Sequence, residues 1–308
     1  MKAKTINAII SGKIKAWTDH IDDPKVKDAV EKNTICTGGC IASMLLNEKV
    51  NDFDFYFRTR EAAMIVASYY VEQFKKNPSP KFKGGDKTVQ IYIDDKAEDR
   101  VKIVVKSAGI ASEESTAQYE YFEARPDERG GEYVAEVLDQ SEQEEAEPTP
   151  DDKPQYRPVF LSANAITLAN GVQLVTRFYG EPEAIHANYD FVHVMNYWTS
   201  WDRKVVLKPE ALEALLTKEL RYVGSKYPLC SIIRVRKFIA RGWTINAGQI
   251  LKMAMNLQTF NLLDLAVLEE QLTGVDVAYF LDVIERLKAK DPTKVDGAYL
   301  IEIIDRMF

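Results

Sequence analysis

Two short patterns constrain the fold of this chain more than any other feature: the glycine pair Gly38-Gly39 and the alternating run Asp52-Phe53-Asp54-Phe55. The apolar residues 34–36 predict a short strand that ends at the glycines, and residues 40–46 predict a small helix after them. Successive side chains of a strand point to opposite faces, so a strand over the run places both aspartates on one face. Phe53, Phe55 and Phe57 then point the other way, into a core. We therefore expect a strand–turn–helix–strand unit.

Two carboxylates beside a glycine turn suit a magnesium ion that carries a triphosphate. Mg²⁺ is usually bound through one or two carboxylates and completes its octahedron with phosphate oxygens and water. Glycines have no Cβ atom, so phosphates can approach their backbone closely. The alternative is a surface hairpin whose aspartates are simply solvated.

The glycine pair, the spacer from Cys40 to Asn51 and the Asp-apolar-Asp-apolar run resemble the signature of the nucleotidyltransferase superfamily, which includes polymerase beta, poly(A) polymerases and CCA-adding enzymes. The resemblance implies an α+β fold with a mixed β-sheet head, an NTP substrate (ATP or CTP) and Mg²⁺ as cofactor. It implies that Asp52 and Asp54 hold two magnesium ions, one for the attacking hydroxyl and one for the leaving pyrophosphate. It also implies phosphate contacts from the helix turn, through Gly38, Gly39 and Ser43.

Two later residues extend this resemblance. The superfamily often places a third carboxylate on a later strand, and Asp190 is the candidate because it is an acid within the apolar run 189–194, predicted to be a strand. A salt bridge or a turn acid is the alternative for Asp190. Asn170-Gly171 between alternating runs predicts a hairpin. Arg177 at its end resembles the phosphate-binding arginine of bacterial CCA-adding and poly(A) polymerase heads.

A basic helix is predicted over residues 229–240, and the segment 231–245 resembles a CCA-adding motif in which a helix with spaced arginines ends at a Gly-aromatic turn. Helical spacing places Arg234, Lys237 and Arg241 on one face, with an apolar face of Ile232, Val235 and Ile239 opposite. The basic face is expected to bind the triphosphate or an acceptor strand. The alternative is a helix that presents its bases to water.

The chain departs from the CCA-adding pattern in two places. Ala42-Ser43 stands where an Arg-Asp pair is usual, and the Glu-Asp-x-x-Arg nucleotide-selecting motif is missing. The chain as a whole resembles the stand-alone nucleotidyltransferases common in phage genomes. A second function therefore stays open: a non-catalytic nucleotidyltransferase fold that serves as a binding or assembly module.

Charge is distributed unevenly along the chain, whose net charge is −7. Residues 111–152 hold fifteen acids and two arginines, whereas residues 203–241 hold ten Lys/Arg and three glutamates. An acidic total argues against a polyanionic partner, but the basic segment makes an RNA 3′ end a candidate acceptor. Bases on solvated helix faces are the alternative explanation.

The periodicity of the sequence predicts three regions. Residues 1–32 form N-terminal helices that pack on the head, residues 33–208 form the nucleotidyltransferase head, and residues 209–308 form an α-helical C-terminal domain. The head contains an acidic insertion at 111–154, which we expect to be partly disordered.

Other features concern the cellular location of the protein and the roles of its cysteines and histidines. No run of about eighteen apolar residues and no secretory signal pattern is present, so we expect a cytoplasmic protein without a membrane partner. Cys36 and Cys40 are predicted to be buried small hydrophobes, with zinc ligation as the alternative. His186 and His193 match no metal-ligand spacing and are expected in the core or on the surface. Oligomeric state is left open.

Overall fold

The computed structural model of this chain describes residues 1–76, 89–94, 100–107, 155–161, 164–264, 267–268 and 271. These residues fall into two compact units. One holds the described residues up to 187 together with residues 193–215, and the other holds residues 188–192 and the described residues from 216 on. The acidic insertion and residues 272–308 of the predicted helical C-terminal domain lie outside the described residues.

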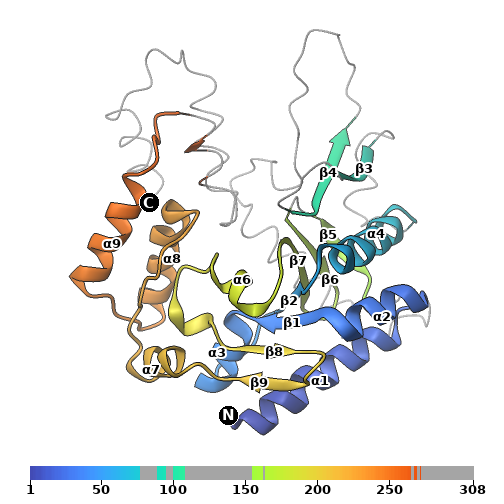
Figure 1. Cartoon of the computed structure of the whole chain (residues 1–308), viewed down its shortest axis with the longest axis horizontal. Coiled ribbons are helices and arrows are strands. Elements are labelled where there is room, and N and C mark those ends of the chain that lie inside the picture. Colours follow the sequence, from blue (N-terminus) through green and yellow to red (C-terminus); the bar gives the residue numbers. More distant parts are fainter. Residues whose placement is uncertain are drawn as a thin grey trace. The chain divides into compact units, whose positions relative to one another are not determined.

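A seven-stranded sheet in the order β5-β6-β7-β2-β1-β8-β9 forms the centre of the first unit (Figure 1). Strand β7 pairs with β2 in parallel, and the other neighbours in this sheet pair antiparallel. A separate antiparallel hairpin consists of β3 and β4. The predicted α+β architecture with a mixed sheet is therefore confirmed. The strand bounds are β1 Thr34–Thr37, β2 Phe53–Phe57, β3 Val89–Asp94, β4 Lys102–Ser107, β5 Pro158–Leu161, β6 Ala165–Leu168, β7 Val172–Tyr179, β8 Tyr197–Thr199 and β9 Lys204–Val206.

Helices α1 to α4 of the first unit supply most of the core that packs on this sheet. The bounds of the helices of this unit are α1 Ala3–Asp19, α2 Pro24–Asn33, α3 Gly39–Leu46, α4 Arg60–Lys76, α6 Pro182–His186 and α7 Pro209–Thr217, the last of which continues past residue 215. The second unit contains α8 Pro228–Ala240 and α9 Ala247–Leu257. Within the residues that the structure describes, no helix is both long and apolar enough to cross a membrane.

The N-terminal helices form because their apolar residues recur at helical spacing and their ends are marked. In α1 the buried side chains follow one stripe, which ends with Trp17. The Trp17 ring stacks on Phe55 with centroids 5.3 Å apart, and its indole N–H donates to the hydroxyl of Tyr70 at 2.6 Å. Helix α2 begins with Pro24 at its first turn and Asp23 as N-cap, whose carboxylate accepts from the Lys25 amide at 2.8 Å.

The core lies on one face of the sheet. Cys36, Phe55 and Phe57 belong to one buried cluster with the helices α1, α2 and α4, whereas Ile35 and Tyr56 are buried outside this cluster. The alternation follows from the strand period, and β1 and β2 share it because Cys36 pairs directly with Phe55. The predicted inward direction of the phenylalanines is confirmed, and burial of one such ring stabilises the fold by roughly 1.5–3 kcal/mol.

The predicted Asn-Gly hairpin is present between β6 and β7. Asn170 and Gly171 both have positive φ, 64° and 60°, which the left-handed turn requires. The Gly171 carbonyl accepts from the amide of Phe53 at 2.9 Å, and a Cβ at Gly171 would lie 2.9 Å from the Asn51 carbonyl oxygen. The hairpin therefore holds the start of β2, where the two aspartates lie.

The strand predicted over residues 189–194 is wrong. Phe191 forms one isolated bridge with Tyr222, and Val192–Val194 forms a 3-10 helix. Pairing is confined to two backbone bonds, in which Val192 N–H donates to the Arg221 carbonyl and Val223 N–H donates to the Asp190 carbonyl. Apolar alternation in this segment reflects the burial of single side chains, and no neighbouring strand among the described residues continues the ladder.

Candidate functional site

The glycine turn lies where β1 ends and α3 begins. Gly38 has φ 96° and ψ −151°, a conformation that residues with a Cβ rarely adopt, and it is the N-cap of α3. Its amide donates to the Val194 carbonyl at 3.2 Å. Gly39 is exposed, and a Cβ built on it would meet no atom within 4 Å. The backbone at the positive end of α3 is therefore open to an anion.

Ser43 lies one helical turn after Gly39 and so shares its face of α3. Ser43 is partly exposed, whereas Cys40, Ile41 and Met44 of the same helix are buried. Burial of the apolar side of α3 turns Gly39 and Ser43 outward together. This placement is compatible with the phosphate contacts expected of both residues.

Both aspartates lie at the start of β2. Asp54 is in register with Gln173 of β7, and Asp52 directly precedes the strand and is exposed. The side chain of Asp54 points to the sheet face opposite Phe55. Thr37 shares that face with Asp54, because Cys36, the residue before Thr37, pairs with Phe55.

The pKa values of Cys36 and Asp52 are both shifted by their surroundings. Burial, a hydrogen bond with Cys40 and the negative charge of Asp54 together raise the pKa of the Cys36 thiol. Partial exclusion of water by the surrounding protein raises the pKa of Asp52, and a backbone hydrogen bond within that residue opposes the rise. The charge of Asp54 on β2 thus affects the pKa of Cys36 on the neighbouring strand β1, two residues before the glycine turn.

The number and chemical type of the side chains in this pair of acids can be compared with what Mg²⁺ requires. Within the described ranges, no group of three or more His, Cys, Asp or Glu side chains could hold a metal ion. Mg²⁺ needs only one or two carboxylates when phosphates and water complete its shell. Asp52 and Asp54 supply that number beside an open backbone. The Cys36 and Cys40 thiols are buried, with their sulfur atoms 3.5 Å apart.

A row of buried polar contacts through Thr37, His186 and Lys208, called here the polar chain, lies next to the glycine turn. The sequence did not predict it. Thr37 Oγ1 lies 2.8 Å from His186 Nε2 and donates to the Asn196 carbonyl at 2.9 Å. Lys208 Nζ lies 3.2 Å from His186 Nδ1. Burial and the charge of Lys208 lower the pKa of His186 to about 4. The neutral ring accepts at Nδ1 from Lys208 and donates at Nε2 to Thr37, the residue before Gly38.

Arg177 lies on β7 and is buried, and its guanidinium donates to the Asn164 side-chain oxygen at 3.0 Å. The backbone of Arg177 also donates to the Asn164 carbonyl at 3.2 Å. These contacts fix the arginine to the segment before β6. A phosphate role for Arg177 stays a prediction.

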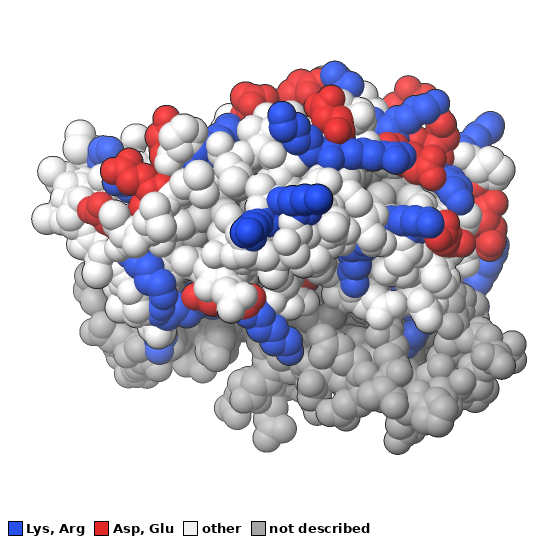
Figure 2. Space-filling view, turned by 90° about the horizontal axis from the view of Figure 1, so that it is seen from below, with Lys and Arg blue, Asp and Glu red and all other residues white. Residues whose placement is uncertain are grey.

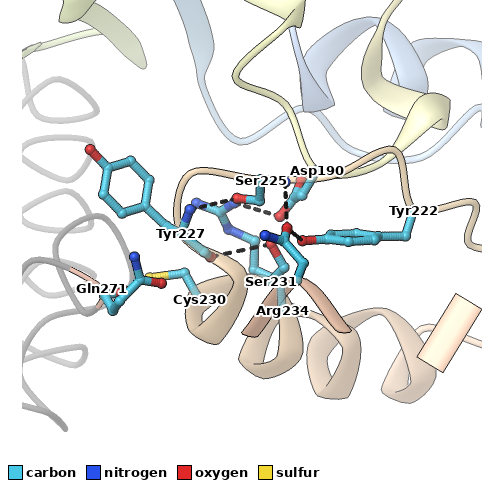
Figure 3. A network of polar contacts seen from close by, with 9 residues as sticks. Asp190, Tyr222, Ser225, Tyr227, Cys230, Ser231, Arg234 and Gln271 are labelled. Carbon is cyan, nitrogen blue, oxygen red and sulfur yellow. Dashed lines mark hydrogen bonds and ion pairs between the residues drawn. The ribbon is translucent and has the colours of Figure 1, made fainter. Parts of the chain in front are cut away.

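The second unit contains the other four candidates. Asp190 forms an ion pair with Arg234, with Nη1 and Oδ2 2.7 Å apart, and the side chains are 8 % and 41 % exposed (Figure 3). Arg234 neutralises the carboxylate within this unit, which is the salt bridge weighed as the alternative to metal binding. Lys237 and Arg241 of the basic face are exposed.

The predicted apolar face of α8 is partly exposed. Its Ile232 and Ile239 are 40 % and 52 % exposed. Instead Ser231 is buried, and Phe238 packs edge-on against Trp243 with ring centroids 5.9 Å apart. Arg234 lies on the same side of the helix as Ser231 and Phe238. The side of α8 that packs within this unit therefore carries Ser231, Arg234 and Phe238.

Polar contacts join the loop before α8 to α8 itself and to α9 (Figure 3). Tyr222 donates to Asn256 Oδ1 at 2.6 Å, and the Ser225 amide donates to the same oxygen at 3.1 Å. Burial raises the pKa of Tyr222 to about 12; a hydrogen bond with Ser231 lowers it, and the charge of Asp190 raises it. Cys230 donates its S–H to the Gln271 carbonyl at 2.7 Å. This network stabilises the loop.

The distribution of charged side chains on the surface in Figure 2 indicates whether that face suits a polyanionic partner. On the face that it shows, blue and red side chains lie interspersed among white ones and form no continuous basic band over the described residues. A long duplex would find no uniform positive track on that face.

Three solved structures, described as CCA-adding or tRNA-processing enzymes, resemble this chain. The CCA-adding enzyme of Thermotoga maritima complexed with tRNA is 12 % identical over 89 % of this chain and 53 % of its own, with a TM-score of 0.38. A tRNA-processing enzyme with CTP is 13 % identical over 88 % and 54 %, with a TM-score of 0.38. A CCA-adding enzyme with CTP is 13 % identical over 95 % and 52 %, with a TM-score of 0.39. The chain spans about half the length of these enzymes.

No curated protein matches the sequence significantly. A family model does match it, over residues 8–218. The matched span contains the glycine turn, both aspartates of β2 and the polar chain through His186. More than half of the sequence is covered, and the chain is therefore a member of the Gabija anti-defense 2 family.

Proposed function

We propose that this chain is a Mg²⁺-dependent nucleotidyltransferase that moves an NMP from ATP or CTP to a hydroxyl acceptor. One observation carries the proposal: the open backbone at Gly39, on the positive end of α3, lies beside the strand that presents Asp52 and Asp54. An anion site and a cation site at one edge of a sheet suit a metal-bound triphosphate.

Each group has a defined task in the transfer. Gly39 and Ser43 contact phosphate oxygens, and Asp52 and Asp54 hold the metal. The acceptor hydroxyl loses its proton to solvent as its oxygen bonds to the α-phosphorus, the bond from that phosphorus to the oxygen that bridges to the β-phosphate breaks, and pyrophosphate leaves. Mg²⁺, when bound, lowers the pKa of the attacking hydroxyl and neutralises charge on the leaving group. Positioning and charge stabilisation supply most of the rate.

We propose an RNA 3′ end as the acceptor. The support is the excess of Lys/Arg over acids in residues 203–241, together with the exposed Lys237 on α8 and the exposed Arg241 directly after it. A short single strand requires only a few phosphate contacts, so the mixed charge of the rest of the surface does not oppose it.

The test uses α-labelled ATP and CTP with MgCl₂ and total RNA. The Asp54→Asn variant should lose on the order of a thousandfold in rate, because charge stabilisation through the metal accounts for several kcal/mol of barrier. Asp28→Asn is the matched control, since Asp28 is an exposed acid paired with Lys32 on α2. Equal transfer by Asp54→Asn and the parent would disprove the proposal. Label found only in protein bands would reject the RNA acceptor.

A second candidate, a non-catalytic binding or assembly module, is favoured by the Asp190–Arg234 pair. The only third carboxylate that the sequence offered is neutralised by an arginine of its own unit. In that case the parent would bind a magnesium–nucleotide complex, or a protein partner, without releasing pyrophosphate. Calorimetric nucleotide binding alongside a pyrophosphate assay separates the two functions.

A further inference from the structure

We propose that His186 is a positioning residue for the glycine turn: it links Thr37 to Lys208 and so fixes where Gly38 and Gly39 present their backbone. This inference rests on the proposed function for its nucleotide part. The anchoring of the turn itself can be measured without any transfer reaction.

The contacts of His186 are short and buried. Its Nε2 lies 2.8 Å from Thr37 Oγ1, and its Nδ1 lies 3.2 Å from Lys208 Nζ. Thr37 and Asn196 are fully buried and His186 nearly so. Because Thr37 also donates to the Asn196 carbonyl, its hydroxyl is held from two sides. Gly38 follows Thr37 directly and is itself bonded to the Val194 carbonyl.

The surroundings of His186 determine its protonation state and the direction of the hydrogen bonds that it makes. Lys208 Nζ lies 3.2 Å from the ring and 4.0 Å from a Glu183 oxygen, and the Tyr197 ring centroid lies 5.7 Å from that of His186. A cation at Nδ1 and a buried site keep the imidazole neutral near pH 7. One orientation of all hydrogen bonds then results: Lys208 to His186, His186 to Thr37 and Thr37 to Asn196.

Two substitutions of His186 distinguish a role in positioning the glycine turn from a role in the stability of the fold alone. Gln offers one acceptor and one donor at a spacing close to that of the two ring nitrogens, so His186→Gln can reproduce both contacts. His186→Leu keeps the bulk and removes both. The matched control is Tyr70→Phe, which removes a buried 2.6 Å bond from Trp17 on the core side of the sheet.

The experiment measures the amide resonances of Gly38 and Gly39 and the Kd for a non-hydrolysable ATP analogue with MgCl₂. We expect His186→Leu to shift both amides and to weaken binding about tenfold, the effect of one buried hydrogen bond. His186→Gln should restore both readouts, and Tyr70→Phe should leave them unchanged.

Unshifted glycine amides in His186→Leu, or the same shifts in Tyr70→Phe, would overturn the inference. A parent protein that binds no nucleotide would refute the proposed function instead, and the amide resonances would still decide whether His186 holds the turn. If the amides shift but the Kd for the ATP analogue stays unchanged, the turn is anchored by His186 yet does not contact phosphate, which also contradicts the inference.

Discussion

The glycine turn offers a test in which stability and activity change in opposite directions. Gly39 is the first residue of α3, it has no left-handed φ, and a methyl group on it would meet no protein atom within 4 Å. Gly39→Ala therefore adds no strain to the fold. Because alanine restricts the unfolded chain, the free energy of unfolding should rise by about 0.4–1 kcal/mol.

The same methyl group occupies the space through which a phosphate would approach the backbone. Transfer activity should fall by about ten- to a hundredfold, which corresponds to about 1.4–2.8 kcal/mol of lost transition-state binding. Thermal unfolding and pyrophosphate release on one preparation measure both effects.

Gly12→Ala is the matched control for this test. Gly12 lies inside α1, is exposed, and would also have no protein atom within 4 Å of an added methyl group. Its substitution should stabilise the protein by about 1 kcal/mol and leave transfer unchanged. Gly38→Ala is uninformative because its φ of 96° strains any Cβ-bearing residue. Full activity in a stabilised Gly39→Ala variant would refute the phosphate role of the turn.

Two further predictions concern buried polar groups. The native pKa of His186 is about 4 against an ordinary 6.5, so between these pH values the unfolded chain binds a proton that the native chain does not. The free energy of unfolding should fall by roughly 3 kcal/mol as the pH drops through this window, and His186→Gln should remove that slope in urea titrations. In the second unit, Arg234→Leu leaves the buried Asp190 carboxylate unpaired and should cost about 3 kcal/mol, whereas Asp190→Asn leaves an arginine that reaches water and should cost about 1 kcal/mol. Equal losses in urea denaturation would contradict this asymmetry.

Local patterns predicted the parts of the site that depend on neighbouring residues. The glycine turn, the direction of the β2 phenylalanines and the Asn170-Gly171 hairpin follow from backbone φ preferences and the strand period, both of which are properties of a few consecutive residues. The sequence therefore sufficed to predict the α+β head, and to predict that both aspartates lie near the end of β1 that carries the glycine turn.

The contacts that the sequence did not predict join distant segments. Thr37 belongs to β1, His186 ends α6 and Lys208 lies between β9 and α7, and none of them has a diagnostic spacing. Asp190 shows the same limit: its apolar neighbours predicted a strand, but whether a strand forms depends on a partner ladder, and residues 221–223 provide only two bonds. Burial of Ile232 and Ile239 likewise depends on what packs against α8.

The family match covers the proposed metal-binding and phosphate-binding elements but not α8. The match ends at residue 218, next to the end of α7, so it contains the sheet, the glycine turn and both β2 aspartates, while α8 and α9 follow it. Arg234, Lys237 and Arg241 therefore lie beyond the span that defines membership. If the nucleotide is bound by the elements of that span, then Asp54→Asn must abolish binding or transfer, and loss of Lys237 and Arg241 must affect the acceptor alone. The two sets of variants thus assign nucleotide and acceptor to different parts of the chain, and a loss of nucleotide affinity in the α8 variants would show that this division is wrong.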